Sequence, residues 1–425
     1  MSYESTLAYI HSVKWQGSKP GLSRTRHLLA ALGNPEQNLK FVHIAGTNGK
    51  GSTAACIAAC LQAAGCRVGL YTSPYINRFN ERMQVDGVPI PDDMLEALVE
   101  EIRPAADAMA DPPTEFELIT ALGFLYFARE DCDIVVLEVG LGGALDSTNV
   151  IDPPEAAVIT ALGPDHMEVL GGTMTEIARA KAGIIKGGCP VISYGGVPEA
   201  DAVIAETCRI ADSPLYPVDF SRLTIHPSPL TGSRFDFDGL TDLTLPLLGS
   251  YQPKNAAVAI TALRVLAERG WRVTDEHIRA GLAAVRWPGR FELLRTDPPF
   301  ILDGSHNPPG MAATAQSLRD RFPGQRFVFL MSVMADKDVD GILTPILPLA
   351  ERFVTVRAGL PRAMPAEALA ERIQSLGGAA EAAPTIPEGV KRALELAGDG
   401  PVCALGTLYF SADVRKALEH ALSSV

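Results

Sequence analysis

Short apolar runs alternate with longer amphipathic stretches through the first half of the chain. The runs are rich in Val, Ile and Leu and predict buried strands at residues 41–45, 67–71, 134–138, 156–160 and 191–194. The stretches between them predict helices over residues 49–64, 92–109, 116–130 and 173–184. Strands that alternate with helices form a mostly parallel sheet covered on both faces. The pattern therefore predicts an α/β fold, in which ligands bind at the carboxyl ends of the strands.

The pattern changes after residue 215. Residues 215–248 place Pro, Gly, Ser and Asp between short alternating runs, such as 233–237 and 243–247. This spacing predicts a small antiparallel patch. Helical patterns follow at residues 253–269 and 274–284.

A Trp-Pro-Gly-Arg sequence at residues 287–290 predicts a domain junction. Beyond it the alternation restarts, with strands predicted at residues 300–303, 327–331, 353–357 and 402–405 and helices near 309–321, 337–349, 365–376, 387–397 and 411–422. The Ala-rich stretch at 378–383 is expected to be a helix end or a loop. We therefore expect an N-terminal domain over residues 1–287 and a Rossmann-like α/β domain over residues 288–425.

Composition narrows the class of protein. The 425 residues are 47% hydrophobic and 20% charged, as in ordinary globular proteins, and the net charge of -13 argues against nucleic-acid binding. The sequence shows no signal peptide and no apolar run long enough to span a bilayer. Seven cysteines without a Cys-x-x-Cys pair favour a reducing, cytoplasmic location. Cys56 and Cys60, one helical turn apart, are expected to be core residues rather than metal ligands.

The strand at 41–45 enters a Gly-rich turn, Gly46-Thr-Asn-Gly-Lys-Gly-Ser-Thr53, which opens into a helix. Glycines let backbone N–H groups approach an anion, Lys50 supplies a cation, and Ser52 or Thr53 can reach Mg²⁺. The spacing is shorter than in the standard phosphate loop. The order of strand, turn, Lys, hydroxyl and helix nevertheless favours a phosphate site over an ordinary turn, and indicates a P-loop ATPase-like first domain.

Polar residues also follow other predicted strands. Glu138 ends an apolar strand before a Gly-rich turn, where a Mg²⁺-binding carboxylate is expected. His166 follows another strand, and the pattern leaves open whether it is a ligand or a surface residue. Lys181, by composition, would pass for a solvated helix residue. Asp303 and His306 lie in a turn dense in polar residues that closes a strand; a metal pair is conceivable, but their roles stay open.

The loop at residues 71–82 carries two arginines and leaves a predicted strand. It could hold an anionic or aromatic substrate beside the nucleotide. The alternative is a surface loop with ion pairs.

Taken together, these segments resemble the folylpolyglutamate synthase/dihydrofolate synthase family, within the Mur ligase superfamily. The resemblance runs from about residue 17 to residue 411. Its motifs include the phosphate loop, whose short spacing is the normal form in this family, Glu138-Val-Gly-Leu-Gly-Gly143, Lys181-Ala-Gly-Ile, Trp287-Pro-Gly-Arg-Phe-Glu292 and Asp303-Gly-Ser-His-Asn-Pro308.

The resemblance implies an ATP-dependent ligase that uses Mg²⁺, with two ions expected. In this family the carboxylate of a folate or a dihydropteroate attacks the γ-phosphate of ATP, and the amine of L-glutamate then attacks the acyl phosphate. It implies no nucleic-acid or membrane partner, and we expect a monomer.

The resemblance also assigns roles to individual positions. The expected nucleotide-binding residues are Asn48, Gly49, Lys50, Gly51, Ser52, Asn255, Arg290 and Asp303. The expected Mg²⁺ ligands are Ser52, Ser73, Glu138 and His166, and the expected substrate-binding residues are Phe116, Asp146, His306 and Ser411. Lys50, Lys181, Asp303 and His306 would serve catalysis, and Lys181 matches a lysine that is carbamylated in the family.

Several positions depart from the family pattern: Tyr75 and Tyr251 stand where His is common, Ala144 where Arg is frequent, and Ala180 where Glu is frequent. These departures leave open whether both synthase activities are present. One alternative is another Mur-type amide ligase, although too little chain precedes Gly46 for a nucleotide-sugar domain. The other is a non-catalytic nucleotide-binding regulator.

Overall fold

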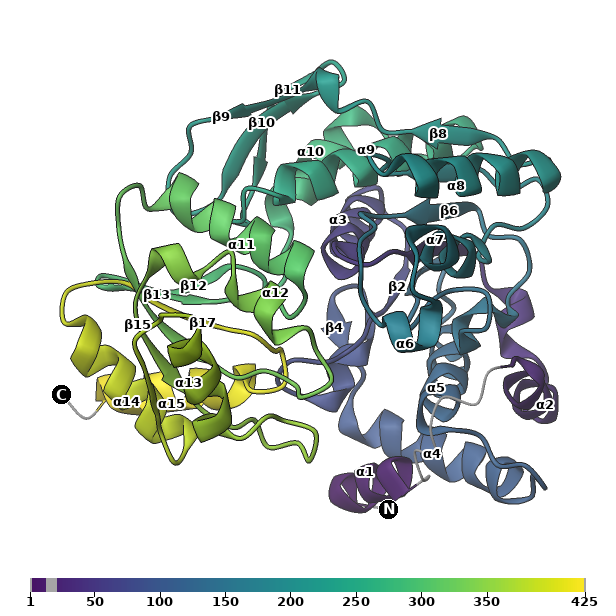
Figure 1. Cartoon of the computed structure of the whole chain (residues 1–425). Coiled ribbons are helices and arrows are strands. Elements are labelled where there is room, and N and C mark those ends of the chain that lie inside the picture. Colours follow the sequence, from purple (N-terminus) through teal and green to yellow (C-terminus); the bar gives the residue numbers. More distant parts are fainter. Residues whose placement is uncertain (1, 13–20, 424–425) are drawn as a thin grey trace. The chain divides into compact units, whose positions relative to one another are not determined.

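The computed structural model describes residues 2–12 and 21–423, which fall into two compact units (Figure 1). Unit 1 comprises Met1–Leu223, Phe237–Leu243 and Lys254–Val285, and unit 2 comprises Thr224–Asp236, Thr244–Pro253 and Arg286–Val425. Residues 17–20, where the family resemblance begins, lie outside the described residues.

The sheet of unit 1 has the strand order β4-β3-β2-β5-β1-β6-β7-β8. Its strands are β1 (Phe41–Ala45), β2 (Val68–Tyr71), β3 (Met83–Val85), β4 (Val88–Pro89), β5 (Ile134–Glu138), β6 (Ala156–Ile159), β7 (Val191–Ser193) and β8 (Leu215–Pro217). The neighbours β2, β5, β1, β6 and β7 are parallel, as predicted. The prediction of an antiparallel patch from residue 215 was wrong for β8, which pairs parallel with β7 at the edge of this sheet. At the other edge, β3 and β4 pair antiparallel, which the apolar runs did not indicate. In the central register Ile44 lies opposite Glu138, so the phosphate-loop strand ends beside the acidic strand end.

The helices of this part of the chain are α1 (Tyr3–Ser12), α2 (Ser23–Ala31), α3 (Lys50–Ala63), α4 (Asp92–Asp107), α5 (Glu115–Arg129), α6 (Met167–Leu170), α7 (Met174–Ala182), α8 (Pro198–Ile210), α9 (Gln252–Glu268) and α10 (Asp275–Ala284). Helix α3 packs on β1, β2 and β5 and against α10. The two helices approach closely because Gly281 of α10 has no side chain. A Cβ on Gly281 would lie 2.4 Å from the Cα of Cys60 on α3. Cys56 and Cys60 are fully buried, which confirms that they are core residues.

A separate three-stranded sheet has the order β11-β10-β9, formed by β9 (Leu223–His226), β10 (Ser233–Phe237) and β11 (Leu240–Leu245). The two-residue turn between β10 and β11 makes this pair an antiparallel hairpin, as predicted. The last strand, however, runs over Leu240–Leu245 rather than 243–247. Pro246 follows it, and proline has no N–H to continue a ladder.

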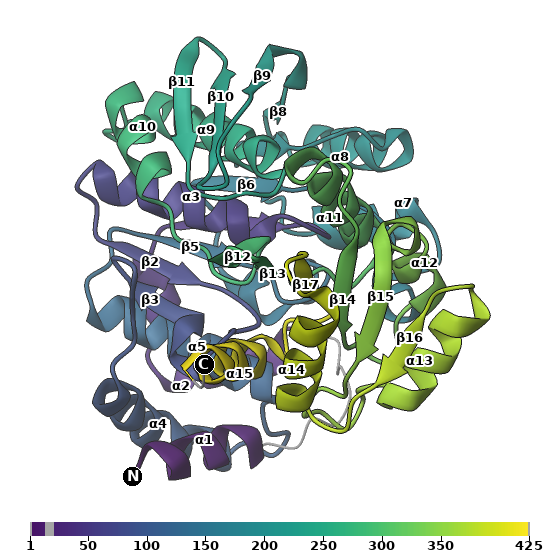
Figure 2. The ribbon, with the colours of Figure 1, turned by 90° about the vertical axis from the view of Figure 1, so that its left-hand side faces the viewer.

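The sheet of unit 2 has the order β12-β13-β17-β14-β15-β16 and is parallel except for β12. Its strands are β12 (Glu292–Thr296), β13 (Pro299–Leu302), β14 (Phe327–Met331), β15 (Ala350–Thr355), β16 (Ala380–Ala382) and β17 (Val402–Leu405). Its helices are α11 (Pro308–Arg321), α12 (Val339–Leu343), α13 (Ala366–Ser375), α14 (Ile386–Ala397) and α15 (Ser411–Ser423). Figure 2 shows β14 and β15 side by side, and α14 packs on both.

Two predictions in unit 2 were wrong. The helix expected over residues 337–349 is broken into the short α12 and a 3₁₀ turn at Leu347–Leu349, because Pro345 and Pro348 cannot continue a helix. The stretch expected to be a helix end or a loop contains the edge strand β16, which pairs with β15. Its Ala-rich composition does not signal a strand, so the pairing is a tertiary effect.

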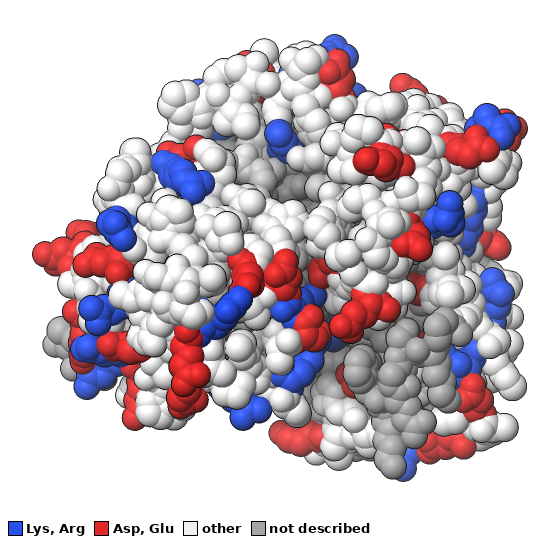
Figure 3. Space-filling view, in the orientation of Figure 1, with Lys and Arg blue, Asp and Glu red and all other residues white. Residues whose placement is uncertain are grey.

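One face of the molecule shows how charged side chains are distributed. On the face that Figure 3 draws, Lys and Arg are interspersed with Asp and Glu over the part that the structure describes. Among the described residues, no helix has both the length and the apolar character needed to cross a membrane.

Candidate active site

The turn between β1 and α3 has the geometry of a phosphate cradle. Gly49, at φ 85°, is the N-cap of α3 and brings no capping side chain, so the first N–H groups of the helix point toward a potential anion. A Cβ on Gly49 would lie 2.5 Å from Oδ1 of Asn255, and one on Gly46 would lie 1.8 Å from Oγ1 of Thr160. Only glycine fits this closely approached backbone.

The start of the turn is fixed to the end of β6. The backbone N–H groups of Thr47 and Asn48 both donate to the Ala161 carbonyl, at 3.0 and 3.1 Å. The Thr47 hydroxyl donates to the Gly163 carbonyl at 3.0 Å. The N–H of Asn48 is thus engaged within the protein, and the N–H groups that begin α3 are the better phosphate donors.

Three of the predicted residues meet at the tip of β5. The Nζ atom of Lys50 lies 4.0 Å from Oε1 of Glu138 and donates to the Thr47 carbonyl at 3.3 Å. The other carboxylate oxygen of Glu138 accepts the backbone N–H of Ser73 at 3.2 Å. Glu138 is buried, and Ser52 is buried on the first turn of α3. A cation, a carboxylate and a serine that begins a loop are therefore assembled beside the phosphate cradle.

Lys181 is not the solvated helix residue that its composition suggested. It is buried on α7, and its Nζ atom donates to the carbonyl of Gly46 at 2.8 Å. Burial, and to a smaller extent the neighbouring Lys50, lower the pKa of Lys181 to about 7. A large fraction of this amine is therefore neutral near physiological pH.

His166 has a different environment. It precedes α6 in a left-handed conformation, its side chain is 40% exposed, and its Nε2 atom lies 3.9 Å from Asp165. The His, Cys, Asp and Glu side chains of the described residues form no group of three or more that could hold a metal. A divalent ion near Glu138 would accordingly take its other ligands from hydroxyl groups, such as those of Ser52 and Ser73, from water or from phosphate oxygens.

Phe116 and Asp146 both lie close to Gly140, in the turn that follows β5. A Cβ on Gly140 would be 2.4 Å from the Phe116 ring and 3.2 Å from Oδ2 of Asp146. The Phe116 ring also packs against Tyr71, with the ring centroids 6.2 Å apart. Asp146 is buried, and desolvation raises its pKa, although hydrogen bonds from Thr148 and from backbone N–H groups oppose this. An aromatic ring and a buried carboxyl group thus flank the turn that follows Glu138.

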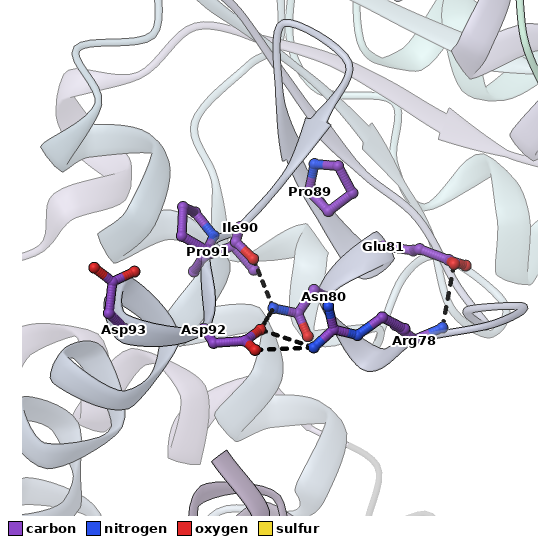
Figure 4. Close-up of a pocket in the computed structure, with 8 residues that line it drawn as sticks. All are labelled: Arg78, Asn80, Glu81, Pro89, Ile90, Pro91, Asp92 and Asp93. Carbon is purple, nitrogen blue, oxygen red and sulfur yellow. Dashed lines mark hydrogen bonds and ion pairs between the residues drawn. The ribbon is translucent and has the colours of Figure 1, made fainter. Parts of the chain in front are cut away.

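The two arginines of the loop at 71–82 differ. Arg78 makes two hydrogen bonds to the Asp92 carboxylate, at 2.9 and 3.0 Å, in a cavity of about 570 Å³ (Figure 4). Asn80 donates to the same carboxylate at 2.9 Å. The ion-pair interpretation therefore holds for Arg78. The Arg82 guanidinium instead lies over the ring of Tyr75 at 5.2 Å.

Unit 2 holds a second group of predicted residues. Asp303 follows β13, accepts the Ser305 N–H at 2.6 Å and accepts the Tyr251 hydroxyl at 3.2 Å. Burial raises the pKa of Asp303, and the positive charge of Arg290 opposes that rise. The Nδ1 atom of His306 donates to the Gly304 carbonyl at 2.8 Å, because a carbonyl can only accept.

Ser411 begins α15 and is fully buried. Its hydroxyl has no hydrogen-bond partner among the described residues. A buried hydroxyl without a partner is costly, so it is available for a ligand at the start of this helix.

Sequence reasoning missed His43 and Thr148. His43 is fully buried in the middle of β1 and lies 3.0 Å from the Thr148 hydroxyl, which contacts Asp146. The available signal was a histidine inside an otherwise apolar run, immediately before the phosphate loop.

The comparisons with known proteins match both parts of the chain. The Mur ligase middle domain matches residues 44–263, and the Mur ligase glutamate ligase domain matches residues 289–406.

Curated relatives match over nearly the full length. The chain is 38% identical to the dihydrofolate synthase/folylpolyglutamate synthase of Bacillus subtilis, covering 98% of this chain and 99% of that protein. It is 40% identical to the folylpolyglutamate synthase of Lacticaseibacillus casei, again covering 98% and 99%.

Solved structures agree. The Mycobacterium tuberculosis folylpolyglutamate synthase complexed with ADP and AMPPCP is 33% identical, with a TM-score of 0.90 over 98% of each chain. An FPGS–AMPPCP–folate complex is 37% identical, with a TM-score of 0.87 over 98% of this chain and 100% of the other. The chain therefore belongs to the folylpolyglutamate synthase/dihydrofolate synthase family of Mur ligases.

Proposed function

We propose that this protein is an ATP-dependent ligase that joins the amine of L-glutamate to the carboxylate of a folate, and also to dihydropteroate. The observation that carries the proposal is the phosphate cradle at α3, with Lys50 beside the buried carboxylate of Glu138. A folate carboxylate is a poor electrophile, and phosphorylation gives it a good leaving group. The ligand chemistry is supported by relatives solved with AMPPCP and with folate.

The nucleotide would be held first by the cradle. The proposed contacts are Asn48, Gly49, Lys50, Gly51 and Ser52, together with Asn255, Arg290 and Asp303. The fit rests on the free helix start at Gly49 and on the close approach of Asn255 to it. Lys50 would neutralise charge that develops as the γ-phosphate moves to the folate carboxylate.

Mg²⁺, with two ions proposed, would supply further charge neutralisation at the phosphates. Its proposed ligands are Ser52, Ser73, Glu138 and His166. The donor set is all oxygen apart from the imidazole, as a hard cation prefers, and Glu138 already contacts the Ser73 backbone.

Lys181 would be modified before it acts. Its lowered pKa leaves a neutral amine that can attack CO₂, which forms the N–C bond of a carbamate and releases one amine proton to solvent. The product is an anion next to the Gly46 carbonyl, where the free amine now donates a hydrogen bond. A carbamate would therefore exchange a cation for an anionic group beside the nucleotide and its ions.

The organic substrates would use the remaining predicted residues. Phe116 would pack against the pterin ring, and Asp146 would accept one of its N–H groups. L-glutamate would bind in unit 2 at His306 and at Ser411, whose buried hydroxyl lacks a partner among the described residues. Once the acyl phosphate has formed, the reaction requires that the amine of glutamate reach its carbonyl and that water be excluded.

The proposal includes a domain boundary, an oligomeric state and a location. We place the boundary between the ATP-binding and glutamate-ligase domains at 287/288, and we propose a cytoplasmic monomer without nucleic-acid or membrane partners. Light scattering at a mass of 45.2 kDa would test the monomer.

A parallel assay tests the activity. Purified protein receives ATP, Mg²⁺ and L-glutamate with either tetrahydrofolate or dihydropteroate, and phosphate release and product mass are followed. We expect glutamate-dependent phosphate release with both acceptors, and products one glutamate longer. Tight ATP binding without such release would support a regulator, and turnover only with a UDP-linked muropeptide would support another Mur ligase.

A further inference from the structure

A buried relay of hydrogen bonds connects the strand that enters the phosphate loop with Asp146. The His43 Nε2 atom, in the fully buried centre of β1, lies 3.0 Å from Oγ1 of Thr148. That hydroxyl donates to Oδ1 of Asp146 at 2.5 Å. The Thr148 backbone N–H donates to the same carboxylate oxygen at 3.0 Å.

The direction of the relay follows from its chemistry. The Thr148 hydroxyl donates to Asp146, so its single proton is used in that bond. The Thr148 oxygen can then only accept from His43, whose Nε2 atom must carry the hydrogen. Burial and the nearby Lys186 hold the pKa of His43 at about 3, so the ring is neutral and has a single N–H.

The relay ends at the turn that the substrate is proposed to contact. The second oxygen of Asp146 accepts the Leu141 N–H at 2.8 Å. This oxygen and the Phe116 ring both flank Gly140, where a Cβ would lie 2.4 Å from the ring and 3.2 Å from the oxygen. The orientation of the carboxylate therefore determines which acceptor lone pairs are presented beside the aromatic ring.

Packing alone does not explain a histidine in the centre of β1. The Nδ1 atom of His43 is buried without a hydrogen-bond partner among the described residues. Burying an unpaired acceptor is unfavourable, and an apolar side chain would fill this core position without that cost. The N–H of this imidazole, which donates to Thr148, gives the position a polar function.

We propose that His43 and Thr148 are positioning residues for the acceptor substrate: they lock the Asp146 carboxylate so that its second oxygen accepts an N–H group from an aromatic heterocycle packed on Phe116. The inference rests on the proposed function, because it needs that substrate to bind at Asp146. Neither residue touches the substrate, so both act through Asp146.

Two pairs of variants test the relay. Thr148→Val replaces the hydroxyl with a methyl group, whereas Thr148→Ser keeps it; His43→Leu removes the N–H, whereas His43→Gln keeps an N–H donor. We expect Thr148→Val and His43→Leu to raise KM for tetrahydrofolate about tenfold, the effect of one charge-assisted hydrogen bond. KM for ATP and kcat should stay within about threefold, and the Ser and Gln variants should recover most of the loss. Thr207→Val, which removes a helix hydroxyl bonded to Val203, serves as the matched control.

A double-mutant cycle locates the effect. If the relay acts through Asp146, Thr148→Val should add little to the KM of an Asp146→Asn variant. The inference is overturned if Thr148→Val leaves KM for tetrahydrofolate unchanged, if Thr148→Ser is equally impaired, or if KM for ATP rises in parallel. A wild-type protein without glutamate-dependent turnover would instead refute the proposed function. Because His43→Leu could fail to fold, thermal unfolding is recorded for each variant, and the Thr148 pair decides the question alone.

Discussion

Lys50 and Lys181 both lie beside the turn between β1 and α3, but their surroundings differ, and this difference determines their chemistry. Lys50 lies within 4.0 Å of the Glu138 carboxylate. Lys181 is buried against the Gly46 carbonyl, with its pKa lowered to about 7. Lys50 is therefore placed beside anionic groups, and Lys181 is suited to react as a neutral amine.

Lys50→Ala should remove a charge that acts mainly in the transition state. By comparison with other charge-stabilising groups, we expect a loss of about 3–5 kcal/mol, or about 10² to 10⁴-fold in kcat/KM for ATP. Steady-state kinetics would measure this, with Lys391→Ala on the exposed face of α14 as the control. Turnover of Lys50→Ala close to that of the control would exclude this role.

The fraction of Lys181 that forms a carbamate should depend on pH. The amine must be neutral to attack CO₂, so carbamate and activity should both rise as pH increases through about 7. Labelled bicarbonate and ¹³C NMR would detect the carbamate. Lys181→Ala should lack the signal and be inactive, with partial rescue by a small carboxylic acid.

The control for this experiment is Lys186, whose pKa burial lowers to about 8 and whose Nζ donates to the Asn149 carbonyl. Lys186→Ala should keep the carbamate signal. Full activity of Lys181→Ala without rescue would make Lys181 purely structural.

Burial of Lys181 also affects stability in CO₂-free buffer. Its pKa is lower in the folded than in the unfolded chain, so between about pH 7 and the ordinary lysine value the unfolded state binds more protons. The free energy of unfolding should therefore rise with pH in that window. Denaturant titrations of the wild type and Lys181→Ala would show it, since the variant should have a smaller increase, the remainder coming from Lys186, whose pKa is also lowered.

At the scale of elements, the β1–α3 turn depends on one backbone conformation and one close contact. Gly49→Ala would add strain at φ 85° and a clash with Asn255. Gly65 has almost the same φ, 84°, and a Cβ added there would meet nothing within 4 Å, so Gly65→Ala isolates the strain. We expect about 1–2 kcal/mol of destabilisation in Gly65→Ala and a larger loss in Gly49→Ala, which alone should weaken ATP binding. Thermal unfolding would measure the stability of each variant, and nucleotide titration its affinity for ATP. Equal losses of stability and affinity in the two variants would show that the contact with Asn255 has no effect.

The apolar runs were sufficient to predict the central strands and the position of Glu138 at a strand end, because the period and length of an apolar run indicate directly which residues are buried. They did not indicate β16 or the β3–β4 edge, whose short or Ala-rich sequences become strands through their neighbours. The break between α12 and the following 3₁₀ turn was signalled by Pro345 and Pro348, and the wider helical periodicity concealed it.

At the scale of the whole molecule, a net charge of -13 requires that an anionic nucleotide be attracted locally. A nucleotide that binds the folded but not the unfolded state should stabilise the protein by about 2.7 kcal/mol when its concentration is 100 times its Kd. We expect AMPPCP with Mg²⁺ to raise the unfolding temperature, and Lys50→Ala to reduce this shift strongly. An unchanged unfolding temperature in the wild type at saturating AMPPCP would contradict the phosphate site.

The sequence by itself determined the local features: the alternation of strands and helices, the Gly-rich turn with Lys50, and an acid at the end of β5. These depend on residues close together in the chain, whose spacing carries the signal. The tertiary structure decided that Lys181 is buried against Gly46, that Phe116 and Asp146 flank Gly140, and that His43 reaches Asp146 through Thr148. Those contacts join residues far apart in sequence, and burial and hydrogen bonding exist only once the sheet and its loops have formed.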